Sequence, residues 1–178
     1  MRIISGKYKG RVLDGFDIKG TRPTMERVKE SLFAQIQMFI SNSHVLDLFS
    51  GSGNLGLEAL SEGANSVVLV DSNPKAVSVI KKNIEKLGCD SVKVLGMDYV
   101  KAIHSLEEQF DIIFLDPPYQ TNYIEKSIEK ITKKDLVKKG GIIVCESDSI
   151  DKIVYPEVYS EIKNKTYGDK TIVIIQKI

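Results

Sequence analysis

The chain has 178 residues, 42% hydrophobic and 28% charged, which is typical of one globular domain that buries a core without disulfides or metals. Its two cysteines, Cys89 and Cys145, form no CxxC motif and suit a reduced cytosolic protein. Because the start lacks the apolar core of a signal peptide and no run approaches membrane-spanning length, we expect a cytoplasmic protein without membrane or metal partners.

The net charge of +1 is unevenly distributed along the chain. Residues 1–40 carry eight Lys or Arg against four Asp or Glu, a balance of +4, whereas the remainder carries 17 against 20, a balance of −3. A basic leader on a mildly acidic body suggests contact with a polyanion, with nucleic acid as the leading candidate. A solvated hairpin with ordinary lysines is the alternative, and charge alone does not decide between them.

The first forty residues predict a hairpin and a helix. The stretch "RIISGKYKGRVL" has two short apolar segments around Gly6 and Gly10, as in a β-hairpin. A helix capped by Thr24 is predicted over about 24–40, because apolar residues recur there every four positions, at Val28, Leu32, Ile36 and Ile40. We expect residues 1–40 to form an N-terminal basic extension and residues 41–178 to form the main domain.

From residue 44 onward, apolar strands alternate with helices. Strands are predicted at "HVLDLF", "SVVLVD", "SVKVLG", "FDIIFLD" and "GGIIVCE", and helices at about 54–63, 74–87 and 122–138, with a short one after the third strand. This alternation indicates a parallel sheet covered on both faces. The last segments, "VYSEIKNKTYG" and "DKTIVIIQKI", have no helix between them and must pair antiparallel through a tight Gly-Asp turn.

A glycine loop follows the first strand. In "VLDLFSGSGNLGLEAL", Gly51, Gly53 and Gly56 form G-x-G-x-x-G between a strand and a helix, where backbone N–H groups can approach a ligand. Asp71 ends the next strand, 20 residues after Gly51, where a carboxylate can accept both ribose hydroxyls. The same spacing describes an NAD site, so the glycines alone do not identify the ligand.

Asp47 favours a cationic ligand. It lies just before the glycine loop, where an anion would repel a pyrophosphate but attract an ammonium group. A cationic ligand with a ribose and no pyrophosphate fits S-adenosylmethionine, although Asp47 could instead only cap the following turn. Asp98, after the third strand, could accept from the adenine amino group, cap a helix, or do both.

The fourth strand ends in Asp116, Pro117, Pro118 and Tyr119. At the switch point of the sheet, Asp116 would face the same crevice as the glycine loop. The two prolines fix φ and donate no N–H, so the loop presents acceptors suited to an N–H₂ group, and Tyr119 offers a face for base stacking. Such acceptors would localise the lone pair of an exocyclic amine and stabilise its developing charge. A proline-rich turn with an incidental carboxylate is the alternative.

With these residues in place, the chain resembles the class I methyltransferases that act on exocyclic amino groups, and specifically the RsmD family of 16S ribosomal RNA guanine-N2 methyltransferases. The similarity covers nearly the whole chain, including "RIISGKYKGRVL", "TRPTMERVKESLFAQI", "VLDLFSGSGNLGLEAL", "DPPY" and "YGDKTIVII". The leader followed by "RPT…RVKESLF" is the most specific part, because many amine methyltransferases share the glycine loop and "DPPY".

The resemblance implies a Rossmann-like α/β sheet of five parallel strands plus a C-terminal antiparallel hairpin, in the order 3-2-1-4-5-7-6, with the N-terminal hairpin and helix as an extension. It implies methyl transfer from S-adenosylmethionine to guanine N2 of 16S rRNA. We expect a monomer, because nothing in the sequence demands more, and a small-subunit assembly particle as the partner; the sequence leaves open both the oligomeric state and whether naked RNA suffices. The implied cofactor-binding residues are Asp47, Phe49, Ser50, Gly51, Gly53, Asp71, Ser72, Asp98 and Tyr99. The implied catalytic residues are Asp116, Pro117 and Tyr119. The implied substrate-binding residues are Arg2, Lys7, Lys9, Arg11, Arg22, Arg27 and Pro118.

Three other functions stay open. An adenine-N6 or other amine methyltransferase of DNA or RNA would use the same "DPPY" corner, although the chain has no separate target-recognition domain. A non-catalytic RNA-binding assembly factor could keep the fold, and a nicotinamide-dependent dehydrogenase is disfavoured by Asp47 and "DPPY". Glu58 and Glu146 could support the site or could be solvated or capping residues.

Overall fold

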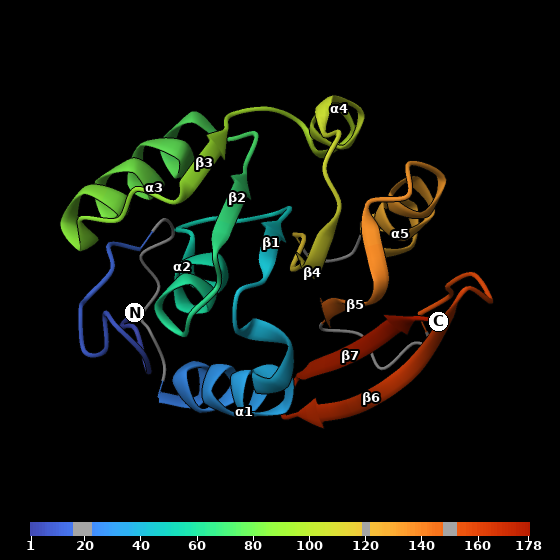
Figure 1. The fold of residues 1–178 in the computed structure, drawn as a ribbon. Helices are drawn as coiled ribbons and strands as arrows, with labels where there is room; N and C mark the ends of the chain where they lie inside the picture. The colour runs from blue at the N-terminus through green and yellow to red at the C-terminus, as the bar shows by residue number, and fades with distance from the viewer. Residues whose placement is uncertain (16–22, 119–121, 148–152) are drawn as a thin grey trace.

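Seven strands form one sheet in the order β3-β2-β1-β4-β5-β7-β6, with helices on both faces (Figure 1). The structure, a computed structural model, describes residues 1–15, 23–118, 122–147 and 153–178. The strands are β1 (His44–Asp47), β2 (Ser66–Val70), β3 (Val92–Leu95), β4 (Phe110–Leu115), β5 (Val137–Ser147), β6 (Tyr159–Tyr167) and β7 (Lys170–Lys177). The helices are α1 (Pro23–Ile40), α2 (Asn54–Ser61), α3 (Pro74–Leu87), α4 (Tyr99–Ser105) and α5 (Tyr123–Lys133).

The sheet confirms the predicted α/β class and strand order. Strands β1 to β5 pair in parallel, whereas β7 pairs antiparallel with both β5 and β6. Strand β1 lies between β2 and β4, so the strand order reverses there. This reversal is the switch point at which open α/β sheets bind ligands.

Both faces of the sheet are buried, because alternate residues of the central strands enter different cores. In β4, Phe114 packs with α1, and its ring centroid lies 5.9 Å from that of Phe33. Its neighbours Ile113 and Leu115 face the other core, which includes residues of α4 and α5. The near-continuous apolar run of β4 is therefore what a central parallel strand requires.

Helix α1 confirms the predicted apolar face but not the predicted cap. The residues that recur every four positions are buried: Val28, Leu32, Ile36 and Ile40. The helix begins at Pro23, so Thr24 lies inside its first turn rather than before it. Proline suits the first helical position, because the N–H that it lacks would have no partner inside the helix.

Helix α5 is shorter than predicted. It ends at Lys133, not near residue 138, and Lys134 is its C-terminal cap. Asp135 has a φ of 56°, a left-handed conformation that does not continue a right-handed helix. The chain then enters β5 at Val137, which pairs with Phe110.

The N-terminal leader is a narrow hairpin bonded to the end of α2. An antiparallel bridge joins Arg2 to Val12, as the hairpin prediction requires. The backbone N–H of Lys7 donates to the Ser61 carbonyl at 2.7 Å. A Cβ atom at Gly6 would lie 1.8 Å from that carbonyl oxygen, so only glycine permits the approach. The division of the chain after residue 40 stays a prediction.

Candidate active site

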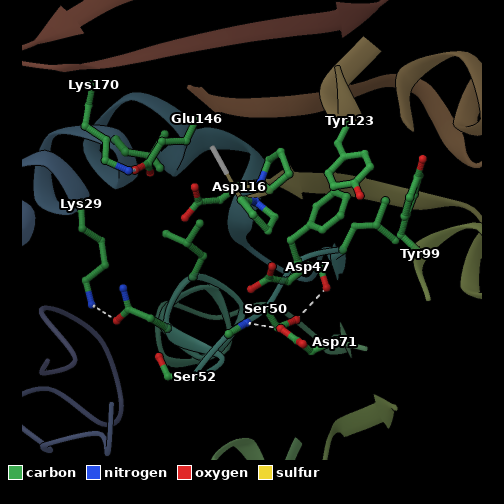
Figure 2. Close-up of a pocket in the computed structure, with 18 of the residues that line it drawn as sticks. Lys29, Asp47, Ser50, Ser52, Asp71, Tyr99, Asp116, Tyr123, Glu146 and Lys170 are labelled. Atoms are coloured by element: carbon green, nitrogen blue, oxygen red, sulfur yellow. Dashed lines mark hydrogen bonds and ion pairs between the residues drawn. The ribbon is translucent and has the colours of Figure 1, made fainter. Parts of the chain in front are cut away.

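A cavity of about 880 Å³ opens along the carboxyl ends of the parallel strands (Figure 2). On its loop side lie Asp47–Ser52, Asp71–Ser72 and Asp98–Tyr99. On its hairpin side lie Asp116–Pro118 and, from the last three strands and their turns, Glu146, Tyr167, Asp169 and Lys170. Between them stand residues of α1 and α2, namely Glu26, Val28, Lys29, Leu32, Asn54 and Leu55. The cavity therefore occupies the predicted switch point.

Asp47 is a buried carboxylate, and only one of its two oxygens has a hydrogen-bond partner among the described residues. Its side chain is 1% exposed, and its Oδ2 accepts from the Gly56 N–H at 3.1 Å. Its Oδ1 is buried and has no hydrogen-bond partner among the described residues. Burial raises the pKa of Asp47 to about 7. A cationic donor at Oδ1 would stabilise the ionised form, so the geometry fits a ligand ammonium as well as the turn-capping role.

Gly56 allows this arrangement through close packing. A Cβ atom there would lie 2.4 Å from Leu69 Cδ2, so a side chain would push α2 away from β2. The glycine keeps the first turn of α2 against the strands, and its N–H reaches Asp47.

Asp71 holds the glycine loop and keeps acceptor capacity for a ligand. Its Oδ2 accepts from the Gly51 N–H at 2.9 Å, and its Oδ1 accepts from the Asn73 N–H at 2.8 Å. Each carboxylate oxygen has two lone pairs, so one on each oxygen is left for a ribose hydroxyl. Ser50 has a different use, because its hydroxyl donates to the Asp47 carbonyl and accepts from the Val70 N–H.

Three aromatic rings stand beside Asp98 on the loop side. The ring centroid of Phe49 lies 5.4 Å from that of Tyr99 and 6.1 Å from that of Tyr123, the latter pair nearly parallel. Asp98 lines the cavity and also caps α4 by accepting from the Val100 N–H at 2.9 Å, so the helix-capping interpretation is confirmed. A flat apolar group next to a carboxylate is suited to a purine with an exocyclic amine.

Tyr123 was missing from the sequence prediction. It lies in the first turn of α5, shortly after the "DPPY" motif, whose four residues were the predicted site residues in this part of the chain. An aromatic residue at the start of the helix that follows the fourth strand was the available signal.

The "DPPY" corner opens on the same cavity. Strand β4 pairs with β1 so that Phe114 lies opposite Asp47, which brings Asp116 to the same edge of the sheet. Asp116 is half-buried, and Pro117 and Pro118 line the cavity beside it. Tyr119 lies outside the described residues. Figure 2 shows the three carboxylates of Asp47, Asp71 and Asp116 around one space.

Two ion pairs that the sequence did not predict include lysines that line the cavity, Lys29 and Lys170. Lys29 Nζ lies 2.6 Å from Glu58 Oε2, with side chains 5% and 0% exposed. Lys170 Nζ lies 2.5 Å from Glu146 Oε1, with side chains 16% and 15% exposed. The first pair joins α1 to α2, and the second joins β7 to β5 at the hairpin side.

The Lys29–Glu58 pair also holds the leader. Glu58 accepts from the N–H groups of Ile4 and Ser5, each at 2.9 Å, and Lys29 Nζ donates to the Arg2 carbonyl at 2.8 Å. Burial lowers the pKa of Lys29, and the Glu58 carboxylate opposes that shift. Glu58 is thus a buried partner of the leader rather than a solvated residue.

Most predicted RNA contacts are exposed on the leader and α1. Exposed cations are Arg2, Lys7, Lys9, Arg11 and Arg27. A second cavity of about 350 Å³ is lined by three of them, Arg2, Lys9 and Arg27, and shares Glu26 with the larger one. Arg22 lies outside the described residues. Gly53 is buried at the start of α2 and is not among the described residues that line either cavity.

Among the described residues, two kinds of feature are absent. No helix in this part of the chain is both long and apolar enough to cross a bilayer. Nor do its histidines, cysteines and acids include a group of three or more placed to hold a metal ion.

The family model described as Conserved hypothetical protein 95 matches residues 1–176. The chain belongs to this family, the RsmD family. A relative from Haemophilus influenzae named "Ribosomal RNA small subunit methyltransferase D" is 35% identical, over 94% of this chain and 89% of its own. The match confirms the family that the sequence motifs indicated.

Solved structures agree with this family assignment. The structure of yhhF from Escherichia coli superposes with a TM-score of 0.89 at 29% identity and covers 99% of this chain and 97% of its own. The structure of an rRNA methylase from Streptococcus thermophilus has a TM-score of 0.65 at 17% identity, over 89% of this chain and 99% of its own. At that identity the likeness shows the fold alone, which is the class I methyltransferase fold.

Proposed function

We propose that the protein transfers a methyl group from S-adenosylmethionine to the exocyclic N2 amine of a guanine in 16S rRNA. The observation that carries this proposal is the shared cavity, in which the acceptor corner at Asp116 faces the same space as Asp47 and Asp71. The name of the Haemophilus influenzae relative supports small-subunit rRNA as the substrate. The choice of guanine N2 rests on the family resemblance of the sequence.

The loop side fits the cofactor residue by residue. Asp47 Oδ1 would accept from the α-ammonium group, and Asp71 would accept from the ribose hydroxyls. Asp98 and the rings of Phe49, Tyr99 and Tyr123 would surround the adenine. S-adenosylmethionine supplies a methyl group made electrophilic by its sulfonium.

Asp116 and the carbonyl oxygens of the proline corner would orient the acceptor amine. By accepting both N–H groups they favour the pyramidal amine, whose lone pair then points at the methyl carbon. In the transfer, the electron pair of the C–S bond would stay on sulfur as the C–N bond forms, and Asp116 or water would take the extra proton from nitrogen. Alignment can supply roughly 7–11 kcal/mol in favourable systems.

The second cavity, beside the first, would bind the RNA backbone through its three cations, Arg2, Lys9 and Arg27. Two acids, Glu26 and Glu30, also line it, and Glu26 is paired with Arg2. Guanine N2 lies on the minor-groove edge, so the base must be unstacked before in-line transfer. Unpaired loops of structured RNA make this step easiest. We propose a monomer that acts on a small-subunit assembly particle.

Methylation of immature small subunits tests the function. The protein is incubated with these particles and methyl-labelled S-adenosylmethionine, and the rRNA is then digested to nucleosides. We expect the label in N2-methylguanosine, at one position that sequencing of the labelled fragment would locate. Label in a methylated adenosine would support the adenine-N6 alternative, and binding without label would support the assembly-factor alternative.

A further inference from the structure

We propose that the Lys170–Glu146 pair recognises the guanine edge next to the reacting amine, and so selects guanine over adenine. This inference rests on the proposed function and assigns its specificity to two residues outside the "DPPY" corner. Glu146 and Lys170 line the hairpin side of the cavity together with Asp116 (Figure 2).

The sheet places these three side chains in a row. Leu115 of β4 lies opposite Cys145 of β5, so the residues that follow them, Asp116 and Glu146, are neighbours at the same edge. In the next strand, Ser147 lies opposite Thr171, and Lys170 precedes it. Neighbouring strands are about 4.8 Å apart. Asp116, Glu146 and Lys170 therefore follow one another along this edge of the cavity as two acceptors and one donor, and their side chains must converge to reach one base.

Guanine carries the complementary order on its Watson–Crick edge. The N2 amine and N1–H are donors and O6 is an acceptor, which match Asp116, Glu146 and Lys170 in that order. Adenine has a lone pair at N1 instead of a proton, and that lone pair would be repelled by the Glu146 carboxylate. Its exocyclic amine also replaces O6, so Lys170 would meet a donor.

The pair can stay intact while it contacts a base. Its 2.5 Å contact joins Lys170 Nζ to Glu146 Oε1, so the second carboxylate oxygen can accept from a base, and an ammonium group has three donors in all. Both side chains are largely buried, so each is positioned by packing before the base arrives. A pair that only fastened β7 to β5 would not need to face the cavity.

A base analogue separates recognition from support. In immature subunits assembled by ligation of a synthetic RNA segment, the guanine located by the labelling experiment is replaced with 2-aminopurine. This base keeps the 2-amino group but has no O6 and no N1–H. The wild-type protein should methylate it at least about 100-fold less efficiently than guanine, as kcat/KM, because both recognition groups lose their partners.

The double variant Lys170→Met/Glu146→Leu removes both groups without leaving a lone buried charge. We expect its kcat/KM on guanine to fall about 100-fold while that on 2-aminopurine changes less than about threefold, so discrimination disappears. Lys133→Met, which breaks the exposed Lys133–Glu129 pair on α5, is the matched control and should change neither value. Unchanged thermal unfolding and cofactor affinity would show that the double variant folds.

The outcomes are distinct. If the double variant loses the same factor in kcat/KM on guanine and on 2-aminopurine, the pair has only a structural role. If the ratio of the two values is the same as in the wild-type protein, the pair does not recognise the base. Either result overturns this inference and leaves the proposed function standing. Failure of the wild-type protein to label any guanine would overturn the proposed function, and the inference with it.

Discussion

The loop side and the hairpin side of the cavity are built differently. On the loop side, Asp71 and Ser50 are hydrogen-bonded to backbone groups. The residues that line this side all lie between positions 47 and 99, except Tyr123. On the hairpin side, Asp116 lines the cavity together with Glu146 and Lys170, which come from distant segments and are joined by an ion pair. The comparison suggests that the cofactor is held by a locally encoded frame and the acceptor by long-range contacts.

The sharpest test of this separation is Asp116→Ala. Methyl transfer should fall roughly 10²–10³-fold or more, because the amine loses the acceptor that orients it. The affinity for S-adenosylmethionine, measured by calorimetry, should change less than about threefold. Asp90→Ala, at an exposed position after α3, serves as the control. Equal loss of transfer and cofactor affinity would place Asp116 on the loop side instead.

Lys29→Met should strongly destabilise the protein. It leaves Glu58 charged and buried without its cation, a loss of about 3–5 kcal/mol in the free energy of unfolding. Lys29→Met/Glu58→Leu should recover much of this loss in urea titrations. If the single variant unfolds like the wild-type protein, the pair does not hold the leader to α1 and α2.

Asp47→Asn should weaken cofactor binding while stabilising the free protein. Removing a charged acceptor for the ammonium should raise Kd by about 10–100-fold, equivalent to roughly 1.5–3 kcal/mol. The free wild-type protein must ionise a buried carboxyl whose pKa is raised from 3.8 to about 7. At pH 8 the asparagine variant should therefore unfold at a higher temperature than the wild-type protein. Its free energy of unfolding should be larger by at most about 4 kcal/mol.

The pH dependence of the wild-type protein follows from the same shift. Between pH 4 and 7 the native state keeps a proton on Asp47 that the unfolded state has lost, so this group makes stability fall as pH rises. Cofactor binding should strengthen over the same range and level off above pH 7, because the ionised form pairs with the ammonium. A flat binding profile from pH 5 to 8, or one that Asp47→Asn does not flatten, would contradict this role.

The smallest expected effect concerns the leader. Arg11→Ala should weaken RNA binding modestly and reduce the slope of log affinity against log salt by about 1, because one phosphate contact is lost. Cofactor affinity should not change. Lys139→Ala, at an exposed position near the amino end of β5, is the matched control. An unchanged affinity and salt slope for Arg11→Ala would remove the leader from the RNA interface.

The sequence by itself determined the alternation of strands and helices and the family, and the family resemblance implied the strand order. The residues that line the loop side depend on local patterns, such as an apolar strand that ends in Asp47, another that ends just before Asp71, and a glycine loop between strand and helix. Local patterns predicted the wrong end for α5, near residue 138. The helix ends at Lys133, because Asp135 adopts a left-handed conformation.

Only the tertiary structure revealed the two ion pairs and the place of Tyr123 in the cavity wall. Glu58 reads as an ordinary helical acid until Lys29 and the leader close over it, from 29 and 54 positions earlier in the chain. Glu146 and Lys170 likewise become partners only when β7 pairs with β5. The physical reason is that periodicity records which face of an element is apolar, whereas charge pairing across elements depends on register and packing.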